Sequence, residues 1–549
     1  MYIRCSIESL YSFIKKHTHI LAILSCTLLT YAIRIFIFDG TGDDGDSLTH
    51  FLIAKNASTH TELFFDHWGK PVYTFLAFPF AHFGFKGIQC FNLLNLVFSQ
   101  SLLYLIAKNL RFKFNWLPSL FLGFCLMSFK IVPSGLTEPL FANFLTFAIL
   151  AYLSGWSIIA TIFISFMPFI RSEGLIILIL ALSYLLIIKR WHVIPFLTIG
   201  HLVLGLLGMK YFDGDFLWTL HNVPYPVNEG FYGSGDALHF ISLTPNMIGP
   251  TITVLFIVGL LLVMIGHNII LQKLSSLKFW ILIILVIGSI IGFYFFHSIA
   301  WATGRFNSLG LTRVMFGILP MISIIAVIPF EFLEEVQFKL NFKSTLIYSL
   351  ISLHLFMLYS GEYSLKWNDY HLKTSQNILV ETVKKLKKFE PDYSQRLLLY
   401  DAPFISVLLN IDPYGNGYER CTSILDKSRV FPLNTIIIWD QYYSGIHSKI
   451  NLDSLVNDNR LVFLFETNQY NEMGQKEKCA VFKIKPEYTL DYSLPEIHKK
   501  LEAIKEDLVR DITFFPKVEK QAYKLGISID SCLNLNAKYF LERKKKETF

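Results

Sequence analysis

Four aspartates lie within eight residues of one early segment, FDGTGDDGDS. They are Asp39, Asp43, Asp44 and Asp46. One carboxylate beside a hydroxyl or amine suffices as a general base, and two or more can instead hold a divalent cation. As an alternative, Asp46 caps a helix that starts at Ser47 and the other aspartates are hydrated. Because so many carboxylates rarely adjoin an apolar run without a function, we expect Asp43, Asp44 and Asp46 to include a catalytic base.

Two residues near this cluster are candidates for substrate binding. His50 lies one helical turn past Asp46, although an interfacial helix position explains it better. Lys70, in the sequence WGKP, directly precedes an apolar run, where a lysine can hold a phosphate at the depth of lipid headgroups. An ordinary membrane anchor of Trp and Lys is the alternative. Beside the acidic segment, we favour phosphate binding for Lys70.

Further charged residues stand at the edges of later apolar runs. Glu138, in TEPLF, is a second site acid or a helix N-terminal charge that favours the dipole, and the two interpretations are equal. Arg171, in RSEG, binds a lipid phosphate or pairs with Glu173 or Glu138 as a structural bridge, which we favour slightly. Arg305 and Arg313 are additional phosphate candidates, with snorkelling to headgroups as the alternative.

The composition indicates a membrane scaffold for these residues. The chain has 549 residues, 53% hydrophobic and 17% charged, with a mean hydropathy of +0.45. Apolar residues form long runs, such as 251–266 and 279–296, so we expect a polytopic α-helical membrane protein. The net charge of +7 comes from basic loops and concerns orientation in the lipid bilayer rather than nucleic acid. The seven cysteines show no CxxC and no metal-ligand spacing, and we expect no metal site.

The apolar runs predict eleven transmembrane spans. They lie at about 18–38, 88–107, 114–129, 136–153, 156–170, 174–188, 192–211, 246–266, 279–299, 311–330 and 344–360. The run 72–85 is short and follows a proline, so we expect a re-entrant or interfacial helix there. This topology places the N-terminus and the basic clusters around Lys108 and Lys189 in the cytoplasm. The candidate site residues then all fall at the outer face, where the loop 212–245 is a candidate wall.

Residues 362–549 differ from the rest of the chain. Apolar runs there shorten to strand length, at 397–400, 435–439, 461–465 and 480–484, and helix-compatible segments lie at 374–389 and 494–509. We therefore expect a transmembrane domain over 1–361, with its acidic outer loop at 39–70, and a small extracytoplasmic α/β domain over 362–549. Asp401 and Asp440 end two predicted strands, where they face a cleft or simply begin turns.

The order of these motifs resembles the GT-C class of membrane glycosyltransferases. The nearest likeness is to the group of protein O-mannosyltransferases and aminoarabinose transferases. The likeness is carried by GDDGDS after the first span, then WGKP, TEPLF and RSEG, and by a soluble domain after the last span. It covers about residues 20–330, whereas the C-terminal domain matches only in position. It implies a GT-C-like fold.

The resemblance also implies a function. It suggests transfer of a hexosyl or pentosyl group from a polyprenyl-phosphate donor to a protein, lipid or glycan acceptor at the outer face of the cytoplasmic membrane. By position, Asp46 matches the loop base, with Asp44 a close second, and Lys70 matches the phosphate-contacting lysine. Ser47 stands where the family pattern has an acid, and an extra acidic pair, Asp43 and Asp44, precedes Asp46. No cofactor is implied, although a pyrophosphate donor would make the aspartates a plausible cation site.

Two other functions are compatible with a polytopic membrane protein. A flippase or transporter of lipid-linked sugars predicts charges at the middle of the bilayer and often a repeat symmetry. Here the charges collect at one face and the sequence shows no repeat, which disfavours transport. A polysaccharide ligase or polymerase predicts its acids and arginines in a large late loop rather than in the first one.

Overall fold

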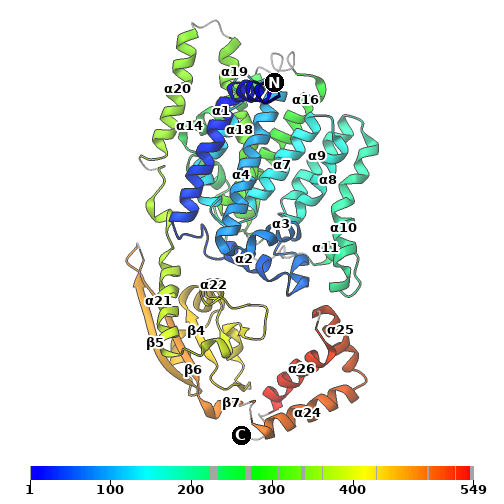
Figure 1. Ribbon diagram of the computed structural model, residues 1–549, viewed down its shortest axis with the longest axis vertical. Coiled ribbons are helices and arrows are strands. Elements are labelled where there is room, and N and C mark those ends of the chain that lie inside the picture. Colours follow the sequence, from blue (N-terminus) through cyan, green and yellow to red (C-terminus); the bar gives the residue numbers. More distant parts are fainter. Residues whose placement is uncertain are drawn as a thin grey trace. The chain divides into compact units, whose positions relative to one another are not determined.

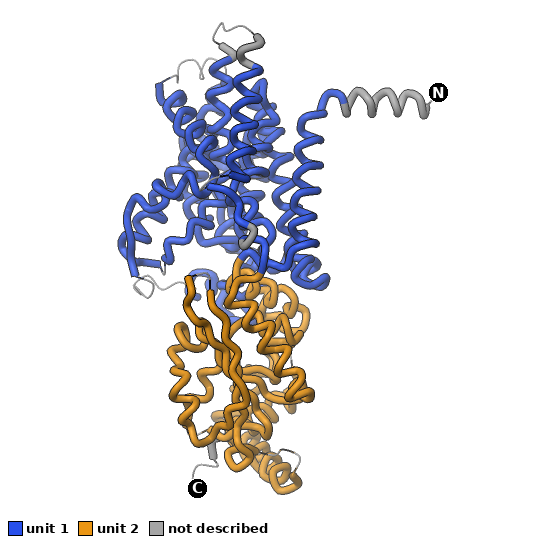
Figure 2. The backbone as a smooth tube through the Cα atoms, turned by 90° about the vertical axis from the view of Figure 1, so that its left-hand side faces the viewer, with its two compact units in different colours: residues 1–42, 65–371 blue, residues 43–64, 372–549 orange. Residues whose placement is uncertain are grey.

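The chain folds into two compact units, coloured separately in Figure 2. The computed structural model describes residues 2–222, 233–265, 274–306, 308–335, 340–360, 363–427, 429–471, 473–490, 492, 494–525 and 527–544. The first unit comprises residues 1–42 and 65–371, and the second comprises residues 43–64 and 372–549. The expected loop 212–245 lies partly outside the described residues, since 223–232 are not among them.

The first unit is helical. Its α-helices are α1 (Tyr2–Ile37), α3 (Pro71–Ala81), α4 (Gly84–Asn109), α5 (Leu117–Gly123), α6 (Leu126–Ile131), α7 (Glu138–Leu153), α8 (Ser157–Phe166), α9 (Gly174–Ile187), α10 (Ile199–Gly208), α11 (Trp218–His221), α12 (His239–Ser242), α13 (Thr244–Ile248), α14 (Pro250–Ile265), α16 (Ser276–Trp280), α17 (Gly288–Thr303), α18 (Leu319–Ile325), α19 (Ile328–Glu335) and α20 (Leu340–Met357) (Figure 1). Short helical segments of other types include η2 (Met167–Phe169), η3 (Trp191–Thr198), η5 (Ile281–Ile287), η6 (Thr312–Ile318) and η7 (Trp367–Tyr370).

Several of these helices are long and apolar enough to cross a membrane. Within the described residues there are five, at 15–37, 84–109, 191–211, 276–303 and 312–333. Five other expected spans correspond to shorter apolar helices, at 138–153, 157–169, 174–187, 250–265 and 344–357. The multi-pass helical class is therefore confirmed, and the total of eleven spans stays a prediction.

Two segments show how local sequence shapes this unit. The expected span 114–129 is instead divided into α5 and α6, because Cys125 is extended (φ −93°, ψ 157°). The Ser128 hydroxyl bonds to the Leu122 carbonyl across the break at 2.6 Å, which satisfies a buried acceptor. The segment after Lys70 forms α3, whose 11 residues rise only about 16 Å. That length is too short to cross a bilayer, in keeping with the re-entrant or interfacial helix that we expected.

Helix α4 defines two opposite ends of the first unit. Near its start, the Gln89 amide donates to the Gly40 carbonyl at 3.1 Å, and at its other end Lys278 donates to the Asn109 carbonyl at 2.6 Å. At 1.5 Å per residue these contacts lie about 30 Å apart along the helix. We call them the Gly40 end and the Asn109 end. Lys108 therefore lies far from the Gly40 end.

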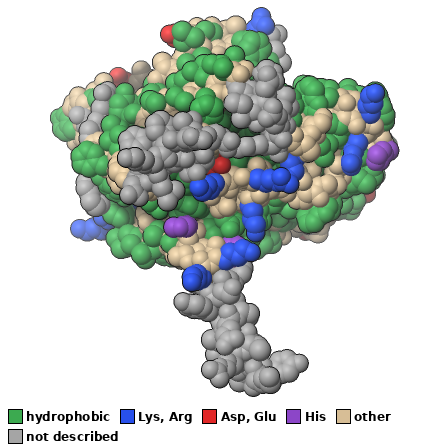
Figure 3. All heavy atoms as spheres, turned by 90° about the horizontal axis from the view of Figure 1, so that it is seen from above, with side chains coloured by type: hydrophobic (Ala, Val, Ile, Leu, Met, Phe, Trp, Pro, Cys, Tyr) green, Lys and Arg blue, Asp and Glu red, His purple; other side chains and the backbone are tan. Residues whose placement is uncertain are grey.

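Basic side chains lie at both ends of the unit: Lys108 lies near the Asn109 end, and Lys86, which bonds to the Phe38 carbonyl, lies at the Gly40 end. Helix α7 starts with Glu138 at the Gly40 end and runs toward the Asn109 end. Just past its last residue, the Arg190 guanidinium donates to the Ser157 hydroxyl at 3.0 Å. Figure 3 views the molecule from the side on which α16 and the start of α1 lie, and Lys and Arg side chains are spread among hydrophobic ones on that face.

The second unit is built around a five-stranded sheet of strand order β2-β1-β4-β6-β5. Its strands are β1 (Leu398–Leu399), β2 (Tyr418–Glu419), β4 (Ile436–Asp440), β5 (Leu461–Tyr470) and β6 (Lys476–Ile484), and a separate pair is formed by β3 (Phe431–Pro432) and β7 (Thr489–Leu490). The three strands β2, β1 and β4 are parallel, whereas β6 is antiparallel to both β4 and β5.

The helices of the second unit are α2 (Asp46–Asn56), α21 (Thr374–Phe389), α22 (Pro403–Leu409), α23 (Leu452–Val456), α24 (Pro495–Arg510), α25 (Phe515–Leu525) and α26 (Ile529–Lys544), with the π-helical turn η10 (Gln441–His447). Helix α21 packs against β5 and β6, as Figure 1 shows. The four expected strands and the two expected helices are all present, so the predicted α/β character is confirmed.

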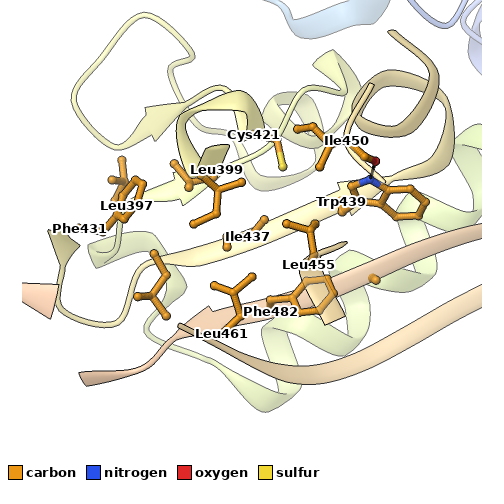
Figure 4. Packing of buried hydrophobic residues seen from close by; sticks show 13 residues of the cluster. Leu397, Leu399, Cys421, Phe431, Ile437, Trp439, Ile450, Leu455, Leu461 and Phe482 are labelled. Carbon is orange, nitrogen blue, oxygen red and sulfur yellow. Dashed lines mark hydrogen bonds between the residues drawn. The ribbon is translucent and has the colours of Figure 1, made fainter. Parts of the chain in front are cut away.

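The core beside the sheet is apolar and closely packed. Figure 4 shows Leu399, Ile437 and Phe482 from adjacent strands meeting Leu455 of α23. The Trp439 indole N–H donates to the Ile450 carbonyl at 2.8 Å, so its one polar group is satisfied within this core. Such packing makes β4 a firm support for whatever follows its last residue, Asp440.

The observed division of the chain differs from the expected one in two places. The boundary falls between His371 and Leu372 rather than at 361/362, and residues 43–64 belong to the second unit rather than to the membrane domain. The reason is side-chain pairing: Lys55 contacts the Asn410 side chain at 2.6 Å, and His60 contacts Asp412 at 2.8 Å. Sequence proximity to the first span concealed these long-range contacts.

Candidate active site

Lys70 is buried in the first unit. Only 4% of the residue is exposed, and its Nζ lies 3.2 Å from the Ser172 hydroxyl. Its backbone is left-handed, with φ +67°, at the point where α3 begins with Pro71. Such a conformation is costly for a residue with a side chain, and it aims Lys70 inward. Burial, more than any neighbouring charge, lowers the pKa of Lys70 to about 8.

Arg171 joins two buried carboxylates in the first unit. Its guanidinium lies 2.7 Å from Glu138 Oε1 and 2.8 Å from Glu173 Oε1. Both acids are buried, Glu138 completely, and Arg171 also donates to the Thr137 hydroxyl at 3.2 Å. The arrangement favours the structural-bridge interpretation of Arg171, because its charge is already shared by two carboxylates. The Arg171 charge also compensates the buried carboxylate of Glu138 at the start of α7.

Two further residues contact the same carboxylates. Arg313, on η6, lies 3.7 Å from Glu138, and His297, on α17, lies 3.5 Å from Glu173. Burial alone would raise the pKa of Glu173, but the charges of Arg171 and His297 and the hydrogen bond from Arg171 together outweigh it and lower that pKa to about 2. Glu173 is therefore ionised throughout the physiological range. Arg305, in contrast, is exposed beyond the end of α17 and is not part of this buried cluster.

We call Lys70, Glu138, Arg171, Glu173 and Arg313 the buried charge cluster. It lies at the Gly40 end, because the residues before Glu138 bond to α4 near Gln89. Asn92 there donates to the Leu136 carbonyl at 2.9 Å, within one turn of Gln89. The cluster combines three cations with two carboxylates in a region largely removed from water, where a phosphate interacts strongly with cations.

The acidic loop leaves the first unit at the same Gly40 end. Asp39 pairs with His371 at 3.0 Å, and the Gly40 N–H donates to the Tyr370 carbonyl. Gly42, with φ +72°, packs against Ser134, so a side chain at this position would collide with it at 2.7 Å. The next residue, Asp43, already belongs to the second unit.

Within the second unit, Asp43 shapes the loop. Its Oδ1 accepts hydrogen bonds from the backbone N–H groups of Gly45 at 2.9 Å and Ser47 at 3.1 Å. Asp43 therefore receives two of the N–H groups at the start of α2. The proposed capping by Asp46 of a helix starting at Ser47 is not observed, since α2 begins at Asp46 and its N-cap is Gly45.

The other loop residues have different surroundings. Asp44 lies 3.4 Å from Lys373 Nζ and accepts a hydrogen bond from the Ser375 hydroxyl at 3.2 Å. Asp46 is half-buried in the first turn of α2, and His50 is buried one turn further along that helix. Asp46 and His50 thus lie on the same short helix, as expected, and both belong to the second unit.

The strand-end aspartates lie on neighbouring strands. Strands β1 and β4 pair in parallel, Asp440 is the last residue of β4, and Asp401 lies two residues past the end of β1. Asp440 accepts hydrogen bonds from the backbone N–H groups of Tyr443 at 2.6 Å and Ser444 at 3.3 Å, which fits the turn-starting interpretation. Burial raises the pKa of Asp440 to about 6. A cavity of about 600 Å³ in this unit is lined in part by Trp439, Lys449, Lys476 and Lys478.

Several participants were not predicted. His297, Lys373 and Ser375 meet the candidate residues from distant parts of the chain, and Tyr443 contacts Asp44 through its hydroxyl. No local motif marks them, because their role depends on tertiary pairing over tens to hundreds of residues. Among the described residues, no group of three or more His, Cys, Asp or Glu side chains is placed to hold a metal ion.

The comparisons with known proteins agree with the architecture. No protein-family model matches the chain, and no curated protein sequence matches it. Among solved structures, ArnT from Cupriavidus metallidurans bound to undecaprenyl phosphate matches with a TM-score of 0.52 at 9% identity, covering 86% of this chain and 99% of that one. The same ArnT without ligand matches with a TM-score of 0.50 at 10% identity, covering 87% and 99%.

A third solved structure, the Archaeoglobus fulgidus oligosaccharyltransferase tethered to an acceptor peptide, matches with a TM-score of 0.48 at 11% identity, covering 97% of this chain and 87% of that one. ArnT is an aminoarabinose transferase of the GT-C class. The likeness to its two structures shows that this chain has the same fold, which confirms the fold expected from the order of its motifs.

Proposed function

We propose that this chain, which has the ArnT fold, is a membrane glycosyltransferase that uses a polyprenyl-phosphate-linked sugar. The acceptor is a glycan, a lipid or a protein, and the transferred group is a hexose or pentose. The fold likeness supports the donor class, since one of the matching ArnT structures holds undecaprenyl phosphate. A shared fold alone does not assign an activity, so the proposal depends on the site.

The observation that carries the proposal is the buried charge cluster around Lys70. Lys70 is 4% exposed and has a strained backbone conformation, and both features lower the stability of the fold. A purely structural role does not explain why such a lysine is kept there. It lies at the Gly40 end, from which the acidic loop departs. A phosphate bound there accepts hydrogen bonds from Lys70, with Arg313 as the supporting cation. Arg171 holds Glu138 and Glu173 in place instead of binding the phosphate itself.

The reaction is a single displacement with inversion. The acceptor hydroxyl or amine attacks the anomeric carbon of the donor sugar while a loop aspartate takes its proton. The bond between that carbon and the phosphate oxygen breaks, and its electron pair stays on the phosphate. Polyprenyl phosphate is the leaving group, and Lys70 and Arg313 stabilise the additional negative charge that it acquires.

The base is Asp44 or Asp46 in this proposal. Asp43 is the third candidate from the sequence, but its Oδ1 already accepts two backbone N–H groups and so maintains the loop. Arg305 is exposed, and His50 is buried in α2, so neither is assigned a direct part in phosphate binding. These assignments rest on burial and bonding within each unit.

We place the reaction on the outer face of the cytoplasmic membrane, with the N-terminus inside. The support is that the exposed Lys108, within a basic stretch of the sequence, lies near the Asn109 end of α4, opposite the Gly40 end where Asp39 lies. Basic residues at membrane boundaries accumulate on the cytoplasmic side. The second unit is then extracytoplasmic, together with the loop that it contains.

The test is turnover by the purified full chain in liposomes. Undecaprenyl-phosphate sugars and undecaprenyl-pyrophosphate sugars are supplied in parallel, each with a glycan, a lipid or a peptide as acceptor and with or without EDTA, and release of the lipid phosphate is followed. We expect release from a monophosphate donor that EDTA does not change, because the phosphate contacts are cationic side chains. Turnover confined to pyrophosphate donors and abolished by EDTA would instead make the aspartate cluster a cation site. No release from any donor would refute the proposal.

A further inference from the structure

The acidic loop is attached to the second unit by contacts of its own. Residues 43–64 group with residues 372–549, and the contacts of Lys55 with Asn410 and of His60 with Asp412 fix α2 and the turn that follows it. The Asp44 carboxylate is held by Lys373 and Ser375, at the start of α21. The second unit therefore determines the conformation of this loop.

One contact reaches the loop backbone directly. The Tyr443 hydroxyl donates to the Asp44 carbonyl at 2.8 Å. The same hydroxyl lies against Gly45, where a Cβ atom would come within 2.8 Å of it. A hydrogen bond and a close steric contact, on consecutive residues, thus define where the loop lies between Asp43 and Asp46.

Tyr443 is itself held firmly. It lies in η10, which starts directly after β4, and its backbone N–H donates to the buried Asp440 carboxylate at 2.6 Å. Its carbonyl accepts from the Ser448 N–H at 2.8 Å, and His447 stacks on its ring with centroids 6.0 Å apart. The hydroxyl is therefore connected through one turn to the central strand of the sheet, so its position depends on the packed core and not on a mobile loop.

We propose that Tyr443 is a positioning residue, which fixes the Asp44–Asp46 backbone so that the catalytic aspartate faces the acceptor. The expected effect of Tyr443 on kcat rests on the proposed function, whereas its effect on the conformation of the loop does not. Burial raises the pKa of Tyr443 well above its ordinary value, so the hydroxyl keeps its proton and acts as a donor. A displacement of about 1 Å in a catalytic group can cost about 100-fold in rate.

The first test compares Tyr443→Phe with Tyr442→Phe in the full chain. Tyr442 is the adjacent residue, 44% exposed, and serves as the matched control. We expect Tyr443→Phe to lower kcat by about 10- to 100-fold and to leave the donor KM within about twofold, because the donor phosphate binds elsewhere. Tyr442→Phe should leave both unchanged. Equal kcat values for the wild type and Tyr443→Phe would overturn the inference.

The second test needs no turnover, so it remains informative if the proposed function fails. Hydrogen–deuterium exchange of the peptide over 41–50 should be faster in Tyr443→Phe than in Tyr442→Phe, because the Gly45 and Ser47 amides are protected within this loop. Unchanged exchange in Tyr443→Phe would refute the positioning role. A wild type that exchanges slowly but transfers no sugar would count against the proposed function alone.

A double-mutant cycle tests the steric contact. Gly45→Ala should disturb the loop in the wild type, because its Cβ would meet the Tyr443 hydroxyl at 2.8 Å. In Tyr443→Phe the nearest ring atom would be 3.9 Å away, an ordinary contact, so the added methyl should cost less. The effects of the two substitutions on exchange should thus be less than additive. Additive effects would contradict direct contact between the two residues.

Discussion

Lys70 is buried, whereas an ordinary lysine is exposed to solvent. If it binds the donor phosphate, Lys70→Ala removes a charge-assisted hydrogen bond worth about 1.5–3 kcal/mol. That loss corresponds to a rise of about 10- to 150-fold in the donor KM. Steady-state kinetics with an undecaprenyl-phosphate sugar measure it. Lys108→Ala, at an exposed lysine near the Asn109 end of α4, is the control and should leave the donor KM unchanged. A donor KM that Lys70→Ala leaves unaltered would remove Lys70 from the site.

The lowered pKa of Lys70 gives a second prediction, about pH. Its pKa falls from the ordinary 10.5 to about 8 because the residue is buried, so the side chain loses its charge above about pH 8. The kcat/KM for the donor should therefore fall as the pH rises through about 8. The free energy of unfolding should rise between about pH 8 and pH 10.5, because the unfolded chain binds more protons than the folded chain over that range. In Lys70→Arg, which stays charged, the decline near pH 8 should disappear; its persistence would contradict the assignment.

Three helical elements depend on the Arg171 network. Arg171 follows η2 and precedes α9, and its guanidinium bridges Glu138 at the start of α7 and Glu173 at the start of α9. Arg171→Ala removes the closest cationic partner of two buried carboxylates, so we expect it to lower the free energy of unfolding by about 3–5 kcal/mol. Thermal unfolding in detergent measures the loss, with the exposed Arg305→Ala as the control. Adding Glu173→Gln to Arg171→Ala should recover part of the stability; no recovery would contradict the pairing.

The elements themselves were largely predictable from sequence. Long apolar runs predict helices and short ones predict strands. Helix α4, the helices around 276–303 and the strands β4 and β6 therefore lie where expected. The break between α5 and α6 was not predicted, because it depends on a buried hydrogen bond between Ser128 and Leu122 that composition does not reveal.

The same contrast holds for the site. Glu138 and Arg171 were identified from their positions at the edges of apolar runs, and the structure joins them, since Glu138 starts α7 and Arg171 lies just before α9. Tyr443 and Lys373 could not have been found this way. Their contacts with the acidic loop connect residues more than 300 positions apart, and only the folded second unit brings them together.

At the scale of the molecule, the proposal requires the two ends of the first unit to face opposite sides of a membrane. Asp39→Cys and Lys108→Cys should therefore react with a membrane-impermeant maleimide from opposite sides in intact cells of an expression host. Asp39→Cys should be labelled from outside, because it lies at the Gly40 end, and Lys108→Cys only after the cells are opened. The unsubstituted protein corrects for native cysteines. Labelling of both from outside would contradict the orientation.

The central claim, that a loop aspartate of this chain deprotonates the acceptor of a lipid-borne sugar, is tested most directly by single-turnover transfer in liposomes. The rate of lipid-phosphate release is measured for the wild type, Asp44→Asn, Asp46→Asn and the double variant, with donor binding measured separately. We predict that one single variant and the double variant lose about 100- to 10,000-fold in rate while still binding the donor. A double variant that turns over at the wild-type rate would contradict the claim.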